Sequence, residues 1–236
     1  MSSKRAGVLF SGGKDSTYTI AKLRDAGFSI SCLITMLSEN TSSYMLHTPN
    51  IRLTELASQA LQIPIVYGNT KGAKEEELEE IKEVVLEAKQ KYGLEALASG
   101  GIASKYQKDR LSLIAEKTGL DSVNPLWGID QKKYVSQIVN EGYRFIITSV
   151  SAAGLDEEWL GREIDHQSVK KLICISEKFG FNASLEGGEG ETLVVDCPIY
   201  IHTRLKIVSA EKIWDGYRGL LKIEKAELVP KEETWS

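Results

Sequence analysis

The stretch AGVLFSGGKDSTYTIAKL, residues 6–23, decides the fold that we expect for this chain. Its first five residues are apolar and predict a short buried strand, and its last part spaces apolar side chains along one face of a helix. The six residues 11–16, SGGKDS, join the two. A strand that passes through a glycine turn into a helix is typical of an open parallel sheet, which presents its ligands at the carboxyl ends of its strands.

The chemistry of residues 11–16 points to a polyphosphate. Glycines allow a tight turn that brings backbone N–H groups against an anion, and the start of a helix adds partial positive charge. Lys14 supplies a cation, and the serines supply hydroxyl donors. A plain strand-to-helix turn with solvated side chains is the alternative. The expected phosphate ligands are Ser11, Gly12, Gly13, Lys14, Asp15 and Ser16.

Two common nucleotide motifs are excluded at this turn. A Walker A loop needs a glycine five residues before Gly13, where Val8 stands, and a serine or threonine after Lys14, where Asp15 stands. A dinucleotide-binding fingerprint needs a G-x-G-x-x-G run at the start of the helix, and that run is missing from the sequence.

The rest of the chain predicts an α/β fold in two parts. Strands and helices alternate, which favours a parallel twisted sheet flanked by helices, and a strand at 144–150 is expected to close it. After residue 151 the pattern changes to that of a smaller C-terminal α+β domain, and we place the domains at 1–140 and 141–236. The expected strands are 6–10, 30–36, 63–67, 94–98, 144–150, 192–195, 205–208 and 220–228, with a turn at Asp215-Gly216 between the last two. The expected helices are 51–61, 74–92, 104–118, 132–141 and 165–179.

Composition narrows the class of protein. The chain has 236 residues, of which 42% are hydrophobic and 26% charged, with a net charge of -4. A negative chain has no overall field to attract a phosphate backbone, so we expect no nucleic-acid partner. The three cysteines form no C-x-x-C pair. The apolar run near the start, residues 6–10, is too short for the apolar region of a signal peptide. We therefore expect a cytoplasmic protein without a membrane span or a protein-held metal cluster.

Two later segments carry unusual residues. Gly100-Gly101 follows the expected strand 94–98, so it shares a sheet edge with residues 11–16. Arg110 either neutralises a substrate anion or is a solvated surface arginine. The acidic segment, residues 185–192 (LEGGEGET), gathers three glutamates among glycines. Clustered carboxylates repel one another unless a cation binds to them. The segment therefore either binds a cationic ligand or is a solvated acidic hairpin.

These motifs resemble a known family. Residues 11–16 resemble the PP-loop of the N-type ATP pyrophosphatases, which bind the pyrophosphate end of ATP while the α-phosphate is attacked. Residues 100–110 (GGIASKYQKDR), 125–127 (PLW) and 185–192 resemble the diphthine–ammonia ligase family specifically. The loop around His47 also resembles a family segment. The chain departs from the family pattern at Leu185, where the family has glycine, and at Gly190, where it has an aromatic residue.

The resemblance implies a reaction and a set of residues. ATP, with Mg²⁺, adenylates the carboxylate of diphthine on translation elongation factor 2, and ammonia displaces AMP to give diphthamide; a homodimer is one candidate assembly. Its alternatives are a tRNA-thiolating PP-loop enzyme and an ATP sensor without turnover. Catalytic roles are expected for Lys14, Asp15, Glu189 and Glu191, and ATP binding also for Thr35, Gly100 and Gly101. The expected substrate-binding residues are Ser104, Tyr106, Gln107, Arg110, Trp127, Glu186, Gly187, Gly188, Glu189, Glu191 and Thr192.

Overall fold

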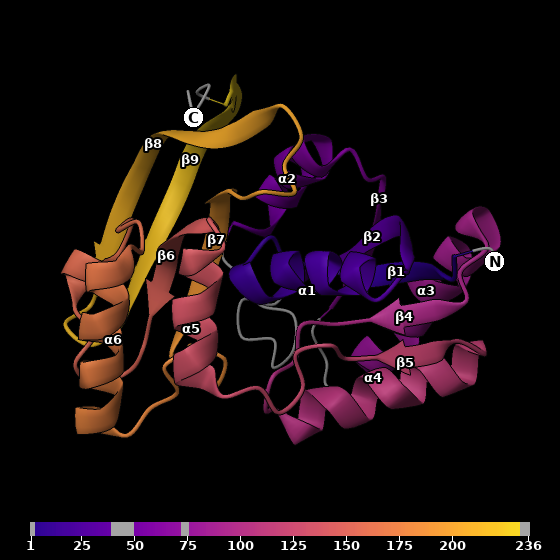
Figure 1. Ribbon diagram of the computed structural model, residues 1–236, viewed down its shortest axis with the longest axis horizontal. Coiled ribbons are helices and arrows are strands. Elements are labelled where there is room, and N and C mark those ends of the chain that lie inside the picture. Colours follow the sequence, from indigo (N-terminus) through magenta and orange to yellow (C-terminus); the bar gives the residue numbers. More distant parts are fainter. Residues whose placement is uncertain (1–2, 39–49, 72–75, 232–236) are drawn as a thin grey trace. The chain divides into compact units, whose positions relative to one another are not determined.

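A computed structural model describes residues 3–38, 50–71 and 76–231, which form two compact units (Figure 1). We call them the parallel unit and the antiparallel unit after their sheets. The parallel unit comprises Met1–Ser11, Asp15–Thr54 and Ile63–Ile129, and the antiparallel unit comprises Gly12–Lys14, Glu55–Gln62 and Asp130–Ser236. The predicted division into domains 1–140 and 141–236 differs from these discontinuous units and stays a proposal.

The parallel unit is built on a sheet of five parallel strands in the described part of the chain, in the order β3-β2-β1-β4-β5. The expected α/β sheet is therefore confirmed. Because β2 and β4 flank β1 on opposite sides, the winding reverses at β1, and a ligand crevice is expected outside the carboxyl ends of β1 and β4. The strands are β1 (Arg5–Leu9), β2 (Ser29–Ser38), β3 (Ile65–Thr70), β4 (Ala96–Ala98) and β5 (Asp121–Val123).

Helices cover this sheet because its strands carry apolar residues on both faces. Side chains of α3 (Glu76–Tyr92) and α4 (Lys105–Thr118) share one buried cluster with alternate residues of β2. Leu33 of β2 and its partner Val8 of β1 are also fully buried, on the opposite face of the sheet. Helix α1 (Lys14–Asp25) contributes further buried side chains. The main members of the shared cluster are Cys32, Ile34, Met36, Val66, Ile81, Val85, Ala88, Leu97, Leu111 and Ile114.

The strand expected to close the first sheet does not belong to it. β6 (Arg144–Val150) lies between β7 and β9 in the second sheet, so that assignment is wrong. The edge is instead formed by β5, which has three residues and begins with the polar pair Asp121 and Ser122. An apolar run does not reveal which sheet it joins, and a three-residue strand is too short to show alternation.

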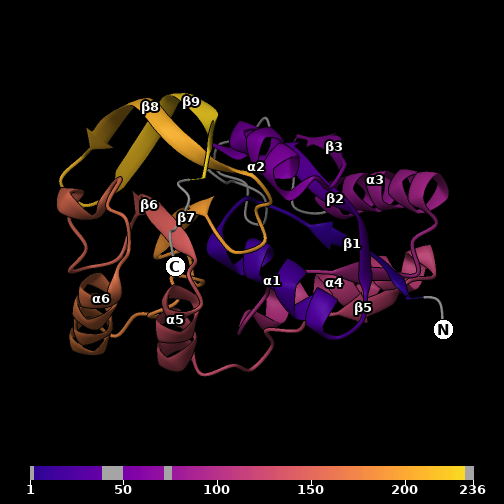
Figure 2. The ribbon, with the colours of Figure 1, turned by 45° about the horizontal axis from the view of Figure 1, so that its top comes forward.

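The antiparallel unit contains a four-stranded sheet among the described residues, in the order β7-β6-β9-β8, with antiparallel neighbours (Figure 2). Its other strands are β7 (Gly190–Asp196), β8 (Thr203–Trp214) and β9 (Gly219–Pro230). β8 and β9 form a hairpin at the predicted turn. Gly216 has a φ of 99°, and the Asp215 carboxylate accepts hydrogen bonds from the N–H groups of Tyr217 and Arg218.

Helices α2 (Thr54–Leu61), α5 (Gln131–Asn140) and α6 (His166–Phe179) complete the secondary structure around this sheet, with short 3₁₀ turns at Ile51–Leu53 and Glu157–Trp159. Helices α5 and α6 lie side by side (Figure 1). Each is preceded by a capping aspartate, Asp130 or Asp165, whose carboxylate accepts a hydrogen bond from the N–H group three residues later.

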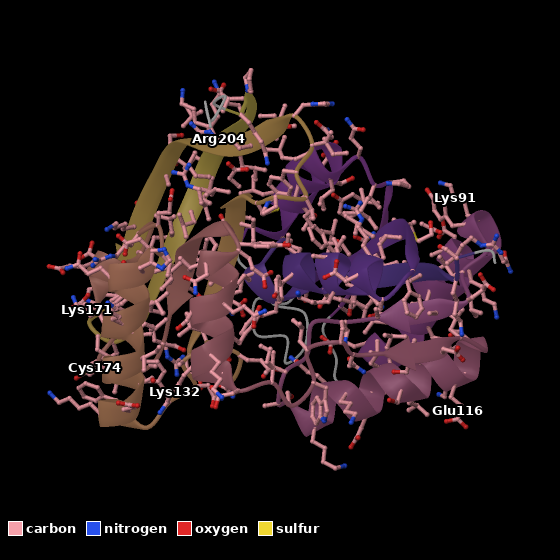
Figure 3. All side chains as sticks on the ribbon, viewed as in Figure 1. Lys91, Glu116, Lys132, Lys171, Cys174 and Arg204 are labelled. Carbon is pink, nitrogen blue, oxygen red and sulfur yellow. The ribbon has the colours of Figure 1, made fainter. Side chains whose placement is uncertain are left out.

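The three cysteines are not joined in disulfides. Cys174 is exposed on α6 (Figure 3), and Cys32 and Cys197 are buried. Among the residues that the structure describes, no helix combines the length and the apolar character needed to cross a membrane.

Candidate functional site

The phosphate loop, residues 11–16, is closed by its two serines. The Ser11 N–H donates to Ser16 Oγ over 3.3 Å, and the two hydroxyls hydrogen-bond to each other over 3.2 Å. Gly12 has a φ of 77°, a conformation that favours glycine. Helix α1 begins at Lys14, so the amides of the loop surround a helix N-terminus. Lys14 is only 2% exposed.

Strand β7 of the antiparallel unit lies along the middle of this loop. The Val194 N–H donates to Gly12 O over 3.0 Å, and the Lys14 N–H donates to Thr192 Oγ1 over 3.2 Å. Gly12–Lys14 is grouped with the antiparallel unit. Thr192, expected to bind substrate, thus contacts the phosphate loop.

Gly100 lies against the start of α1, as the shared edge of β1 and β4 predicts. A Cβ at this position would lie 2.7 Å from the backbone carbon of Asp15 and 2.9 Å from the Ser16 nitrogen. Real Cβ atoms do not approach backbone so closely, so only glycine fits here. Gly100 and Gly101 therefore bring main chain, not side chains, to this edge.

Thr35 holds the end of β1 in place. Its hydroxyl donates to Phe10 O over 2.6 Å, and the residue is 1% exposed. The Phe10 N–H donates in turn to Ile34 O, so β2 secures the residue just before the phosphate loop. The expected contact of Thr35 with ATP stays a prediction.

The start of α4 holds four expected substrate-binding residues. Ser104 caps the helix, because its Oγ accepts a hydrogen bond from the Gln107 N–H over 3.4 Å. The Arg110 guanidinium lies 4.2 Å from the centre of the half-exposed Tyr106 ring. This stacking orients both side chains.

Trp127 has a neighbour that the sequence did not indicate. The Lys108 ammonium lies 4.2 Å from the centre of the Trp127 ring, in cation–π geometry. A substrate cation that binds Trp127 must therefore displace Lys108 from the ring or use another part of it. A lysine on a helix gives no sequence signal for such a contact.

The acidic segment is held by hydrogen bonds to its backbone. The Ser151 hydroxyl donates to Gly188 O, and the Ser151 N–H donates to Glu189 O over 2.8 Å. The Leu185 N–H donates to Asn182 O over 2.8 Å. Sequence reasoning missed Ser151 and Asn182, because neither belongs to the motif and Ser151 is far from it along the chain.

Glu189 has a distinctive carboxylate. Its Oε1 accepts a hydrogen bond from the Asn182 N–H over 3.1 Å, whereas its Oε2 is buried and has no hydrogen-bond partner among the described residues. A Cβ on Gly187 would lie 2.6 Å from Oε1 and 3.0 Å from Oε2. Gly187 thus leaves the space that this carboxylate occupies.

The two departures from the family motif lie next to each other. Leu185 has a φ of 61°, the conformation in which glycine is favoured, and its side chain is buried. Its Cδ1 lies 3.6 Å from the position of a Cβ on Gly190, and that Cβ would also lie 2.6 Å from Ser149 O. The backbone here has no room for a side chain at residue 190.

The structure brings together the phosphate loop with Gly100 in the parallel unit, and the phosphate loop with Thr192 in the antiparallel unit. Glu189 and Glu191 lie immediately before Thr192 along the chain. Helix α4 brings Tyr106 to Arg110. His47 lies outside the described residues.

Two family models match this chain. Residues 4–122 match the family model "Diphthamide synthase N-terminal domain", and residues 130–229 match "Diphthamide synthase C-terminal domain". Together they span both sheets and the phosphate loop.

Several curated relatives bear the name diphthine–ammonia ligase. That of Bos taurus is 29% identical over 215 residues, which cover 83% of this chain and 80% of the relative. That of Danio rerio is 28% identical and covers 81% and 82%. The longer protein of Schizosaccharomyces pombe is 27% identical over 256 residues, with 95% of this chain and 42% of the relative covered.

Among solved structures, the U34-tRNA thiolase NcsA of Methanococcus maripaludis aligns with 54% of this chain and 53% of its own, at 15% identity and a TM-score of 0.35. That likeness is too weak to support an argument. The two family models and the curated relatives carry the assignment, and the chain belongs to the diphthamide synthase family.

Proposed function

We propose that this protein is an ATP-dependent ligase that joins ammonia to the carboxylate of diphthine and releases AMP and pyrophosphate. Its family and the names of its relatives support this activity. The observation that carries the proposal is the phosphate loop, where a buried lysine begins a helix outside the carboxyl end of the central strand. That arrangement suits the polyphosphate of a nucleotide.

In the first half-reaction, the diphthine carboxylate attacks the α-phosphate of ATP, and pyrophosphate leaves. The loop amides and the Lys14 ammonium stabilise negative charge on the leaving pyrophosphate, which is electrostatic stabilisation aimed at the transition state. Gly100 supports this step, because its main chain packs against the amides at the start of α1. The product is an acyl-adenylate.

Mg²⁺ fits this site as an ion held chiefly by the phosphates. Among the described residues, no group of three or more His, Cys, Asp or Glu side chains could hold a metal. Mg²⁺ in nucleotide sites is commonly bound by one or two carboxylates plus substrate phosphates. Asp15, in the first turn of α1, is the carboxylate that we assign to it. The ion would neutralise phosphate charge.

In the second half-reaction, ammonia displaces AMP from the acyl-adenylate. We assign ammonium to Glu189, whose buried Oε2 has no hydrogen-bond partner in the described part of the chain. An acceptor enclosed in this way costs free energy unless a donor reaches it, and ammonium carries N–H donors and a positive charge. Glu189 can then take the proton that converts ammonium into nucleophilic ammonia.

The protein partner of the reaction is translation elongation factor 2, which carries diphthine. We assign Glu186 and Glu191 to the quaternary ammonium of diphthine, because carboxylates attract a cation. Trp127 stays an expected substrate-binding residue of the parallel unit. Arg110, stacked on Tyr106, is assigned to an anionic group of the substrates. We further propose a cytoplasmic location, which the three free cysteines support, and a homodimer as the assembly to test.

The tRNA-thiolating alternative receives less support. Burial raises the pKa of both Cys32 and Cys197 to about 12, so neither thiol readily forms the thiolate needed for sulfur transfer. Only Cys174 is exposed among the three, and a lone cysteine provides no resolving partner.

Product analysis tests the proposal. The purified chain is incubated with ATP, Mg²⁺, ammonium and diphthine-bearing elongation factor 2. We expect AMP, pyrophosphate and diphthamide in equal amounts, and none of them when the protein substrate is replaced by tRNA. Formation of ADP and orthophosphate, or AMP formation that requires tRNA, would refute the assignment.

A further inference from the structure

Two residues of strand β7 form hydrogen bonds with the phosphate loop, one through its backbone and one through its side chain. Val194 uses its backbone N–H, which donates to Gly12 O over 3.0 Å. Thr192 uses its side chain, whose Oγ1 accepts a hydrogen bond from the Lys14 N–H over 3.2 Å. The two contacts pair residue 12 with 194 and residue 14 with 192, which is the register of an antiparallel strand pair.

The contact at Thr192 occupies a special position in the loop. Lys14 is the first residue of α1, and the first N–H groups of a helix have no acceptor within the helix. Thr192 is 6% exposed and Lys14 is 2% exposed, so water has little access to this hydrogen bond. The hydroxyl of Thr192 therefore supplies an acceptor that helix α1 itself lacks.

β7 is free to make this contact because it is an edge strand. Its inner edge pairs with β6, where Ile147 stands opposite Thr192. Its outer edge carries the contacts to Gly12 and Lys14. The threonine hydroxyl thus ties the lysine-bearing end of the loop to a strand that is already fixed on its other side.

We propose that Thr192 is a positioning residue of the phosphate loop: its hydroxyl fixes the backbone of Lys14 and thereby aims the Lys14 ammonium at the leaving pyrophosphate. This inference rests on the proposed function, and it moves Thr192 from the expected substrate-binding set to the ATP side of the reaction. The backbone contact from Val194 holds the loop near β7 in any variant. The side chain of Thr192 sets the orientation of the helix start.

Three variants isolate the hydroxyl. Thr192→Val removes it while keeping the shape, and Thr192→Ser keeps it while removing the methyl group. Thr148→Val is the matched control, because Thr148 is fully buried in the adjacent strand β6 and its Oγ1 has no hydrogen-bond partner among the described residues. If Thr192→Val does not fold, Thr192→Ala takes its place in the same comparison.

The kinetic readout separates positioning from substrate binding. We expect Thr192→Val to lower kcat for pyrophosphate release by about 10- to 100-fold. The KM for ATP and for the diphthine-bearing protein should stay within about 3-fold of wild type. Thr192→Ser should recover most of the rate, and Thr148→Val should match wild type. An unchanged kcat, equal losses in the Val and Ser variants, or a rise confined to the KM for the diphthine-bearing protein would each overturn the inference.

Hydrogen–deuterium exchange supplies a readout that does not depend on turnover. The amides of residues 11–16 should exchange faster in Thr192→Val than in wild type, Thr192→Ser or Thr148→Val. Equal exchange in all four proteins would overturn the inference. A wild-type protein that forms no AMP and pyrophosphate would refute the proposed function instead, while the exchange measurement would still test the contact.

Discussion

The phosphate loop and the acidic segment both depend on glycine, for opposite physical reasons. At Gly100, the missing side chain lets one main chain pack against another, beside Asp15 and Ser16. At Gly187, it leaves space for a side chain, the carboxylate of Glu189. The first region thus presents backbone amides around one lysine, whereas the second presents an ionisable group. This difference matches leaving-group stabilisation in the loop and proton transfer in the acidic segment.

Removing the charge from the loop should have the largest effect. Lys14→Ala is expected to lower kcat for pyrophosphate release by about 10³-fold or more, because the phosphate loop loses its lysine ammonium. Lys22→Ala on the same helix is the control, since Lys22 pairs with Asp25 over 3.5 Å instead. Circular dichroism would verify that both variants fold. Normal pyrophosphate release by Lys14→Ala would disprove the role of the loop.

Adding one methyl group beside the loop should have the second-largest effect on the rate. In Gly100→Ala, the new Cβ would meet the backbone of Asp15 at 2.7 Å, so the start of α1 must shift. A displacement of this kind can cost about 10²-fold in rate. Both half-reactions should slow together in steady-state assays of pyrophosphate release and amide formation.

Gly27→Ala is the control for this substitution. Gly27 has a φ of 84°, and no atom lies within 4 Å of the position that a Cβ would take, so alanine there should cost about 1–2 kcal/mol of stability and leave the rate intact. Equal rates in Gly100→Ala and wild type would mean that the main chain of residue 100 is not needed near the loop.

Neutralising the acidic segment should affect only the second half-reaction. In Glu189→Gln, the side chain gains an N–H₂ group and loses its charge, so ammonium binds less well. We expect ammonium-dependent amide formation to fall by about 10- to 100-fold, while ATP–pyrophosphate exchange with the diphthine-bearing protein continues. Exchange that falls as far as amide formation would place Glu189 in the adenylation step instead.

Two further variants sharpen this result. Gly187→Ala should reproduce the amidation defect, because its Cβ would lie 2.6 Å from Glu189 Oε1 and displace the carboxylate. Glu177→Gln should not, since Glu177 on α6 pairs with Lys132 at the surface. If Gly187→Ala amidates normally, the position of the carboxylate is not critical.

Removing a helix-capping side chain outside both regions should have the smallest effect. The Ser168 N–H donates to the Asp165 carboxylate at the start of α6 over 2.7 Å, and this hydrogen bond lowers the pKa of Asp165. Asp165→Ala should lower Tm by about 2–4 °C without changing kcat.

The pH dependence of this cap has a defined sign. Because the folded-state pKa lies below the unfolded value, the cap stabilises above the unfolded pKa of about 3.9 and loses its contribution as the pH falls through the lowered folded-state pKa. The Tm difference between wild type and Asp165→Ala should therefore shrink in acid. Thermal melts from pH 7 downward would detect it, and a constant difference would contradict the charged cap.

The amino-acid sequence by itself determined the features that depend on nearby residues. The α/β alternation, the turn at residues 11–16, the hairpin turn at Asp215 and the family all follow from local patterns. Helix and turn hydrogen bonds join residues a few positions apart, so side-chain spacing is enough to predict them.

The tertiary structure alone decided which distant segments meet. β6 belongs to the second sheet, and the Lys14 N–H bonds to Thr192, 178 positions away in the chain. One carboxylate oxygen of Glu189 is buried. Strand pairing and burial join residues far apart in the chain, and many partners satisfy the same apolar or hydroxyl pattern. The motif therefore named Thr192, but only the packed strand shows that its hydroxyl accepts a hydrogen bond from the Lys14 N–H.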